Sequence, residues 1–198
     1  MCGIVGYIGE KQAEAILLGG LKKLEYRGYD SAGIAIIDDG HLNIAKKSGK
    51  LDVLVDALAS SPFKGVVGIG HTRWATHGRP TDNNAHPHKS PNGKIAIVHN
   101  GIIENFQALK NTYLADHTFA SETDTEVVAH LLEKFYEGNL EETVDKVLSL
   151  IKGSYALVVI SQDEPDKIIV SRMDSPLVIG LGQGENFVAS DVPALLAY

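Results

Sequence analysis

The sequence predicts an α+β fold arranged as a layered sandwich of sheets and helices. Its 198 residues suit one domain or at most two. Short apolar runs alternate with longer segments of helical periodicity, which indicates a mixture of strands and helices. Several apolar runs contain almost no polar residue, which is typical of strands that are covered on both faces. We therefore expect sheets that lie between other layers of the molecule.

Seven short strands are predicted from the apolar runs, although periodicity alone does not separate such runs from buried helix. Turns are expected at Asp38–Gly40 and Ser161–Lys167, where polar residues gather. In chain order, the predicted strands are Gly3–Ile8, Gly33–Ile37, Val66–Gly70, Ile95–Val98, Tyr155–Ile160, Ile168–Val170 and Leu177–Leu181.

Helices are predicted where apolar residues recur every three to four positions. Asp124 and Glu126 supply a capping oxygen and acidic charge at the start of one of them. In chain order, the predicted helices are Gln12–Leu24, Asp52–Leu58, Asp124–Phe135 and Glu141–Leu150, of which the second and fourth have the weaker pattern.

Composition excludes several classes of function. The net charge of −7 argues against a nucleic-acid partner, because phosphates require a basic face. No apolar run approaches the roughly 18 residues of a membrane-spanning helix, and the amino-terminal segment lacks the pattern of a signal peptide. A single cysteine excludes an internal disulfide and a cysteine-rich zinc site. We expect a cytoplasmic protein with no membrane partner, because a required free thiol is best kept in a reducing compartment.

The one cysteine, Cys2, directly follows the initiator Met1. If Met1 is removed, a nucleophilic thiol and a free α-amine belong to the same residue. An α-amine has a pKa of about 7.7–8 and is a competent base near neutral pH. A terminal amine that activates its own residue is an established route to covalent catalysis. The alternative is an inert cysteine that packs as a small apolar side chain.

Polar residues follow several predicted strands, where binding groups often gather. Arg73 could hold a carboxylate through a bidentate pair, with Thr76 and His77 as further donors. Trp74 is the only tryptophan, and a tryptophan in such a loop is more often a packing residue than a gate.

Asn100 and Gly101 follow the predicted strand Ile95–Val98. An amide side chain beside a glycine N–H can form an oxyanion hole, whereas Asn-Gly is also a favoured turn. Asp124 either caps its helix or holds a cation such as an amino group.

Two further features have simple structural alternatives. Gly28 could end a helix, although this leaves the polar residues around it, including Arg27, unexplained. His86 and His88 flank a proline, and a His-x-His pair is a weak metal signal. We predict no metal and no cofactor.

Together these residues resemble the class II glutamine amidotransferases, which are N-terminal-nucleophile hydrolases. The resemblance rests on the opening Met-Cys-Gly-Ile-Val-Gly and on Arg27-Gly28, His71-Thr72-Arg73, His99-Asn100-Gly101 and Thr123-Asp124. The strings Leu24–Gly33 and His71–Gly78 are similar to the glutamine–fructose-6-phosphate aminotransferase branch of this family.

The resemblance implies a four-layer αββα sandwich and a glutaminase domain over residues 1–198. In that branch a sugar isomerase portion follows, which this sequence lacks, and the full-length enzyme is expected to be a homodimer. The implied substrate is L-glutamine and the product L-glutamate, with ammonia passed on for amino-sugar synthesis.

The resemblance also implies a role for each site residue. Cys2 attacks the γ-amide of glutamine, its α-amine is the base, and Arg27 and Gly28 line the site, with Arg27 holding the Asn100 side chain. Asn100 and Gly101 form the oxyanion hole. Arg73, with Thr76 and His77, holds the α-carboxylate of glutamine. Asp124 binds its α-ammonium group, and Trp74 gates the passage of ammonia.

Two other interpretations remain open. One is an amide hydrolase with the same nucleophile and another substrate. The other is a non-catalytic ligand-binding module, which retention of Met1 would favour.

Overall fold

The fold was determined from a computed structural model that describes residues 2–74 and 79–198. In chain order its elements are β1 (Gly3–Ile8), α1 (Ala13–Lys23), the 3-10 helix η1 (Glu25–Arg27), β2 (Ser31–Asp38), β3 (His41–Ser48), α2 (Leu51–Leu58), β4 (Val67–Arg73), β5 (His88–Lys89), β6 (Ile95–Ile103), α3 (Phe106–Tyr113), α4 (Thr125–Phe135), α5 (Leu140–Leu148), β7 (Gly153–Ser161), β8 (Glu164–Met173), β9 (Val178–Leu181), β10 (Asn186–Ala189) and the 3-10 helix η2 (Val192–Ala194).

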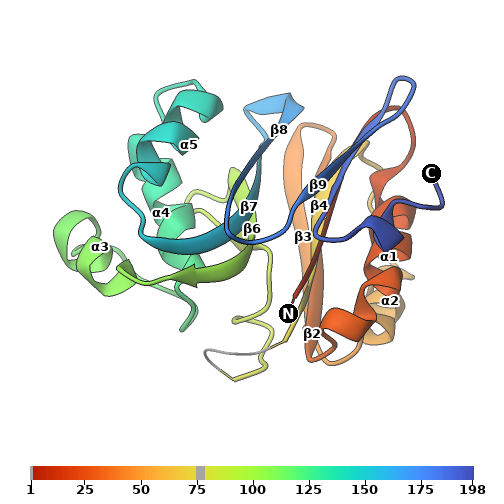
Figure 1. The fold of residues 1–198 in the computed structure, drawn as a ribbon, viewed down its shortest axis with the longest axis horizontal. Coiled ribbons are helices and arrows are strands. Elements are labelled where there is room, and N and C mark those ends of the chain that lie inside the picture. Colours follow the sequence, from red (N-terminus) through yellow and green to blue (C-terminus); the bar gives the residue numbers. More distant parts are fainter. Residues whose placement is uncertain (1, 75–78) are drawn as a thin grey trace.

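Two antiparallel sheets face each other in the middle of the molecule (Figure 1). One sheet has the strand order β3-β2-β4-β1-β10-β9, and the other has the order β5-β6-β7-β8. Apolar side chains from both sheets form one buried cluster between them, which includes Ile4, Ile69, Val98 and Val158. Burying this apolar area stabilises the sandwich by roughly 25 cal/mol per Å².

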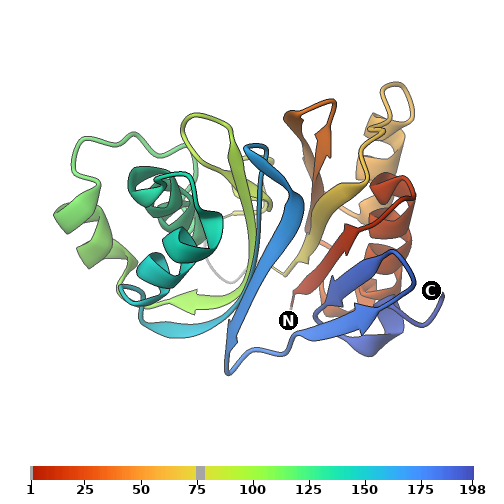
Figure 2. The same cartoon turned by 90° about the horizontal axis from the view of Figure 1, so that it is seen from above.

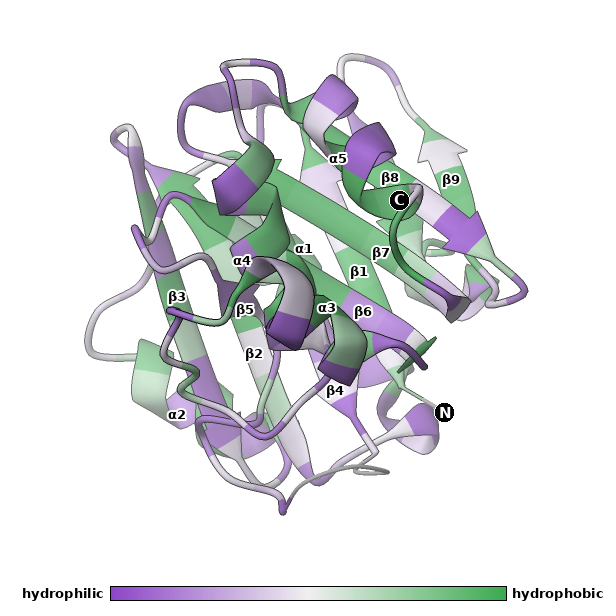
Figure 3. Ribbon diagram, turned by 90° about the vertical axis from the view of Figure 1, so that its left-hand side faces the viewer, coloured by the Kyte–Doolittle hydropathy of each residue, from purple (hydrophilic) through white to green (hydrophobic). Residues whose placement is uncertain are grey.

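Helices cover the outer face of each sheet, so the molecule has four layers (Figure 2). The helices α1 and α2 pack on the six-stranded sheet around Leu17, Leu21 and Leu54. The helices α3, α4 and α5 cover the four-stranded sheet, with Val127 and Leu131 at the centre of their contact. Figure 3 shows the apolar strands behind these helices. The polar residues of the helices lie on the side away from the sheet. The predicted αββα sandwich is confirmed.

The sequence prediction missed four elements, namely β3, β5, β10 and α3. The edge strand β3 escaped detection because its half-exposed residues are mostly polar, and β5, β10 and α3 are short. The predicted turn Ser161–Lys167 is wrong over most of its length, because β7 ends at Ser161 and the edge strand β8 begins at Glu164. The turn at Asp38–Gly40 is confirmed, with positive φ at Asp39 and Gly40.

Two strands extend further than their apolar runs, and this changes the setting of the polar motifs. Strand β4 continues to Arg73 and β6 to Ile103. Asn100 and Gly101 therefore lie inside β6, paired with Ala156 and Tyr155 of β7, and the turn interpretation of this dipeptide is wrong. Gly101 has a φ of 134°, and a Cβ there would collide with the carbonyl oxygen of Ser154.

None of the helices in the described part of the chain is long and apolar enough to cross a membrane.

Candidate active site

The site begins at Cys2, immediately before β1, where three parts of the chain meet at one atom. The carbonyl oxygen of Cys2 accepts a hydrogen bond from Arg27 Nε at 3.2 Å and another from Asn100 Nδ2 at 3.0 Å. Arg27 and Asn100, both predicted from the sequence, are thus brought to the same backbone group. These two bonds hold the start of the chain against η1 and β6.

The thiol of Cys2 is half-buried and lies against the backbone of Trp74. The Trp74 N–H donates to Sγ at 3.3 Å, and the Trp74 carbonyl lies 3.7 Å from the sulfur. Burial raises the pKa of the Cys2 thiol, and the Trp74 N–H and the charge of Arg73 offset part of that rise. A raised pKa leaves the group mainly as the thiol at neutral pH, so attack by this sulfur requires a base.

Arg27 is fixed from its far side by an acidic residue that the sequence analysis did not single out. Its Nη1 lies 2.7 Å from Asp191 Oδ2, and the hydroxyl of Tyr26 donates to the same oxygen at 2.7 Å. The Arg27 side chain is only 7% exposed. The ion pair therefore links the Cys2 carbonyl to the segment that follows β10.

Gly28 is required by a close approach of two backbones and not by the end of a helix. Gly28 does follow directly on η1 as its C-cap, as the helix-stop interpretation predicts, but its φ of 179° is extended backbone that does not itself require glycine. A Cβ at this position would lie 2.7 Å from the carbonyl carbon of Arg73 and 2.8 Å from the nitrogen of Trp74. Glycine lets η1 press on the backbone that contacts the thiol.

A small cleft of about 40 Å³ brings together five of the predicted site residues. It is lined by Cys2, Arg73, Trp74, His86, His99, Gly101, Thr123, Asp124 and Thr125. The thiol, a buried arginine and a carboxylate thus share one cavity. Thr76 and His77, also predicted for the site, lie outside the described residues.

A second hollow, of about 250 Å³, also reaches the thiol. It shares Cys2, Trp74 and Gly101 with the small cleft, and its other lining residues are Arg27, Asn100, Ile102, Ser154, Ser175 and Pro176. Trp74 is 48% exposed and packs edge-on to Tyr29 at 5.6 Å. Cys2 and Trp74 therefore border both spaces.

Asp124 does not cap its helix. It precedes α4 without a side-chain cap bond, and its Oδ2 accepts from the Ile103 N–H of β6 at 2.7 Å. The capping interpretation is therefore wrong. Glu126 instead binds the preceding loop, accepting from Ala120 N at 2.8 Å and Ser121 N at 2.7 Å. Burial alone would raise the pKa of Glu126, but its hydrogen bonds from His130 and Ser121 lower that pKa to about 2.

Four buried histidines lie in and behind the cleft, and threonine hydroxyl groups contact the rings of His86, His88 and His99. The His71 ring stacks on His86 at 4.2 Å, and His86 lies edge-on to His88 at 4.7 Å. Thr125 Oγ1 lies 3.1 Å from His86 Nε2 and 2.8 Å from His99 Nδ1. Burial lowers the pKa of all four rings, that of His71 to about 3.

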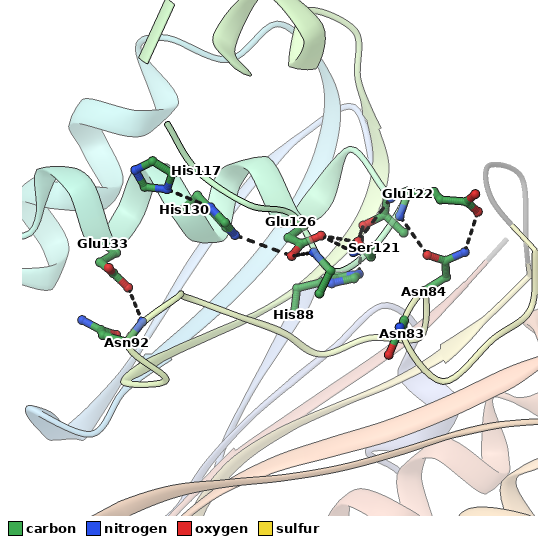
Figure 4. Close-up of polar contacts among 12 residues, drawn as sticks. Asn83, Asn84, His88, Asn92, His117, Ser121, Glu122, Glu126, His130 and Glu133 are labelled. Atoms are coloured by element: carbon green, nitrogen blue, oxygen red, sulfur yellow. Dashed lines mark hydrogen bonds and ion pairs between the residues drawn. The ribbon is translucent and has the colours of Figure 1, made fainter. Parts of the chain in front are cut away.

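The polar contacts continue along α4, away from the cleft (Figure 4). His88 Nε2 lies 3.0 Å from Thr123 Oγ1, and Ser121 joins Thr123 to Glu126. Glu126 then faces His130 at 3.5 Å. Among the described residues, no three histidine, cysteine or acidic side chains are placed to hold a metal ion together.

Sequence reasoning missed His71 and Thr125 as members of the site. Both are fully or almost fully buried, and both contact side chains of residues that belong to the predicted motifs. For His71, the available signal was a histidine directly after the apolar run Val66–Gly70. That signal shows burial and does not show which atom the ring contacts.

The fold and the site define a class of protein: a four-layer αββα sandwich with a cysteine thiol at the start of its first strand, facing a cleft that holds an arginine and an acid. A family model described as a glutamine amidotransferase domain matches residues 71–197, which is more than half of the chain. The chain belongs to the glutamine amidotransferase domain family.

Relatives with similar sequences carry a more specific description. The chain is 58% identical over 199 aligned residues to a glutamine–fructose-6-phosphate aminotransferase [isomerizing] from Caldanaerobacter subterraneus. It is 57% identical to a protein of the same description from Thermus thermophilus. Both alignments cover 100% of this chain, which spans about a third (33%) of the length of these relatives.

Solved structures share the fold. A glutamine phosphoribosylpyrophosphate amidotransferase from B. subtilis, complexed with ADP and GMP, superposes with a TM-score of 0.85 at 32% identity. That match covers 98% of this chain and 42% of the other. A glutamine aminotransferase class-II domain protein from Silicibacter pomeroyi, at 13% identity and a TM-score of 0.61, shares the fold alone.

Proposed function

We propose that this chain hydrolyses L-glutamine to L-glutamate and ammonia through a γ-glutamyl thioester on Cys2. The observation that carries the proposal is the shared cleft, in which the thiol, Arg73 and Asp124 lie together. Glutamine presents a carboxylate, an ammonium group and an amide, and the cleft offers a partner for each. The family membership supports the same chemistry.

The reaction proceeds in two acyl transfers. Cys2 Sγ attacks the γ-carbonyl carbon, the thiol proton passes to the base, and the carbonyl oxygen becomes an oxyanion. Asn100 Nδ2 and the Gly101 N–H are the proposed donors to this oxygen. When the tetrahedral intermediate collapses, the C–N bond breaks and the nitrogen leaves as ammonia with that proton. Water then attacks the thioester and releases glutamate and the thiol.

The base is the α-amine of Cys2 after Met1 has been removed. Because burial raises the thiol pKa, the sulfur needs a proton acceptor, and an α-amine with a pKa of about 7.7–8 is suited to that role. Trp74 N–H, 3.3 Å from the sulfur, would stabilise the thiolate as it forms.

The amino-acid end of the substrate is held by opposite charges. Arg73, 5% exposed, would pair with the α-carboxylate, with Thr76 and His77 as additional donors. Asp124 would bind the α-ammonium group, and its bond to Ile103 N–H fixes the orientation of the carboxylate. Trp74, which borders both hollows, is the proposed gate for departing ammonia.

The relatives' names suggest the role of the longer protein. Ammonia from this domain, residues 1–198, would be used to convert fructose 6-phosphate to glucosamine 6-phosphate by a sugar isomerase portion of the same chain. We also propose that the full-length enzyme is a cytoplasmic homodimer.

Glutamate release from glutamine by the purified protein tests the proposal directly. The assay is paired with the intact mass, which shows whether Met1 is present. Metal-free protein that lacks Met1 should form glutamate and ammonia in equal amounts. Processed, folded protein that forms no glutamate would refute the proposal.

Arg73→Ala is expected to weaken glutamine binding. A charge-assisted contact of this kind contributes about 1.5–3 kcal/mol, which corresponds to a rise in KM of roughly 10- to 150-fold. Steady-state kinetics measure the change, and Arg172→Ala, at an exposed position of β8, is the matched control with an unchanged KM. An unchanged KM in Arg73→Ala would make Arg73 a structural residue.

Asn100→Ala is expected to lower kcat by about 100- to 1000-fold and to change KM little, because the lost donor serves charge that develops in the transition state. Circular dichroism establishes that the variant is folded. Near-normal kcat in folded Asn100→Ala would remove this residue from the oxyanion hole.

A further inference from the structure

We propose that His71 is the positioning residue of the oxyanion hole, because it holds the Asn100 amide in the orientation that turns Nδ2 toward Cys2. This inference rests on the proposed function. His71 comes from β4 and Asn100 from β6, so the contact joins the two facing sheets.

Both ends of the Asn100 side chain are held. Nδ2 donates to the Cys2 carbonyl at 3.0 Å, and Oδ1 lies 3.0 Å from His71 Nε2. An amide nitrogen has two hydrogens, so the second remains for an oxyanion beside the thiol. If the amide turned over, Oδ1 would face the Cys2 carbonyl oxygen, and both hydrogen bonds would be lost.

The contacts of His71 determine its tautomer. Nε2 faces two oxygens, Asn100 Oδ1 at 3.0 Å and the His99 carbonyl at 3.1 Å, and neither oxygen has a hydrogen to donate. Nε2 therefore carries the hydrogen and donates to both. The ring is 0% exposed and its pKa is lowered to about 3, so it is a neutral donor at working pH.

His71 is fixed through its backbone and through one face of its ring. His71 is paired in the sheet with Ile4 of β1 and Gly33 of β2, so its backbone lies at the centre of six strands. Its face stacks on His86, whose Nε2 lies 3.1 Å from Thr125 Oγ1. A ring held in this way can orient Asn100 without touching the substrate, since His71 does not line the cleft.

The test uses two amide substitutions of different reach. His71→Gln can place an N–H near the position of Nε2, whereas His71→Asn is one methylene shorter and cannot. We expect kcat for glutamine hydrolysis to fall by about 10- to 100-fold in His71→Asn and in His71→Leu, less than the loss expected for a deleted oxyanion donor. His71→Gln should stay within about fivefold of the parent, and KM should change little in all three.

Two measurements separate positioning from general damage. Alkylation of Cys2 by iodoacetamide forms no oxyanion, so its rate should be unchanged in the His71 variants. The double variant His71→Leu/Asn100→Ala should lose no more kcat than Asn100→Ala alone, because His71 acts through Asn100. His88→Leu is the control: His88 is also buried, belongs to the same row of rings, and contacts Thr123, not Asn100.

Each outcome decides the inference. It is overturned if His71→Asn keeps parental kcat, if alkylation slows in parallel with turnover, if losses from His71 and Asn100 multiply, or if His88→Leu loses as much kcat as His71→Leu. If His71→Leu does not fold, the Gln and Asn pair decides. An inactive parent would instead refute the proposed function, and the inference with it.

Discussion

Cys2→Ala is expected to reduce glutamine hydrolysis to the background rate, a loss of at least about 1000-fold, because the γ-glutamyl thioester cannot form without the Cys2 thiol. Cys2 is the only cysteine of the chain, so no second thiol can replace it. Glutamate release measures the loss. The small side-chain change at a half-buried position should leave the fold and the binding of glutamate intact.

A second form of the protein is the sharper control for this prediction. Protein that retains Met1 has the thiol but an amide in place of the α-amine, and it should be inactive until an aminopeptidase removes Met1. Full activity in Cys2→Ala would refute the thioester mechanism. Full activity with Met1 attached would refute the α-amine as base and leave the nucleophile in place.

The free energy of unfolding is expected to fall steeply as the pH drops below about 6.5. His71, His86, His88 and His99 have a folded-state pKa below the ordinary value, because burial disfavours their charged forms. Because the pKa of these rings is lower in the folded state, the unfolded chain binds more protons than the folded one below about pH 6.5. Their contribution to the free energy of unfolding is therefore complete above the unfolded-state pKa and is lost on acidification. Four such rings give a limiting slope of about 5 kcal/mol per pH unit.

Urea denaturation between pH 7.5 and 5 measures this slope. A domain with an ordinary free energy of unfolding, about 5–15 kcal/mol, would lose that free energy within a few pH units. His88→Leu removes one of the four groups and should lower the limiting slope by up to about 1.4 kcal/mol per pH unit. His41→Asn, at an exposed position of β3, should leave the slope unchanged. A free energy of unfolding that is flat from pH 7 to 5 would show that these rings are not buried as neutral groups.

Elements with strong local patterns were predictable because burial leaves a periodic trace. Strand β1 and helices α1 and α4 follow apolar spacings that a packed strand or helix explains. Edge strand β3 left a weaker trace, since most of its residues are half-exposed and polar. This strand exists because it pairs with β2, and the spacing of apolar residues gives no information about strand pairing.

The sequence by itself determined the chemical groups of this protein: one thiol beside Met1, an Asn-Gly pair, and an arginine and an acidic residue that suit the charged groups of an amino-acid substrate. Only the tertiary structure decided which atoms these groups contact. Asp124 binds Ile103 of β6 and does not cap its helix, and His71 reaches Asn100 across the sheets. The physical reason is that side-chain spacing reports which face of an element is buried, whereas hydrogen bonds between distant elements depend on how the two sheets pack.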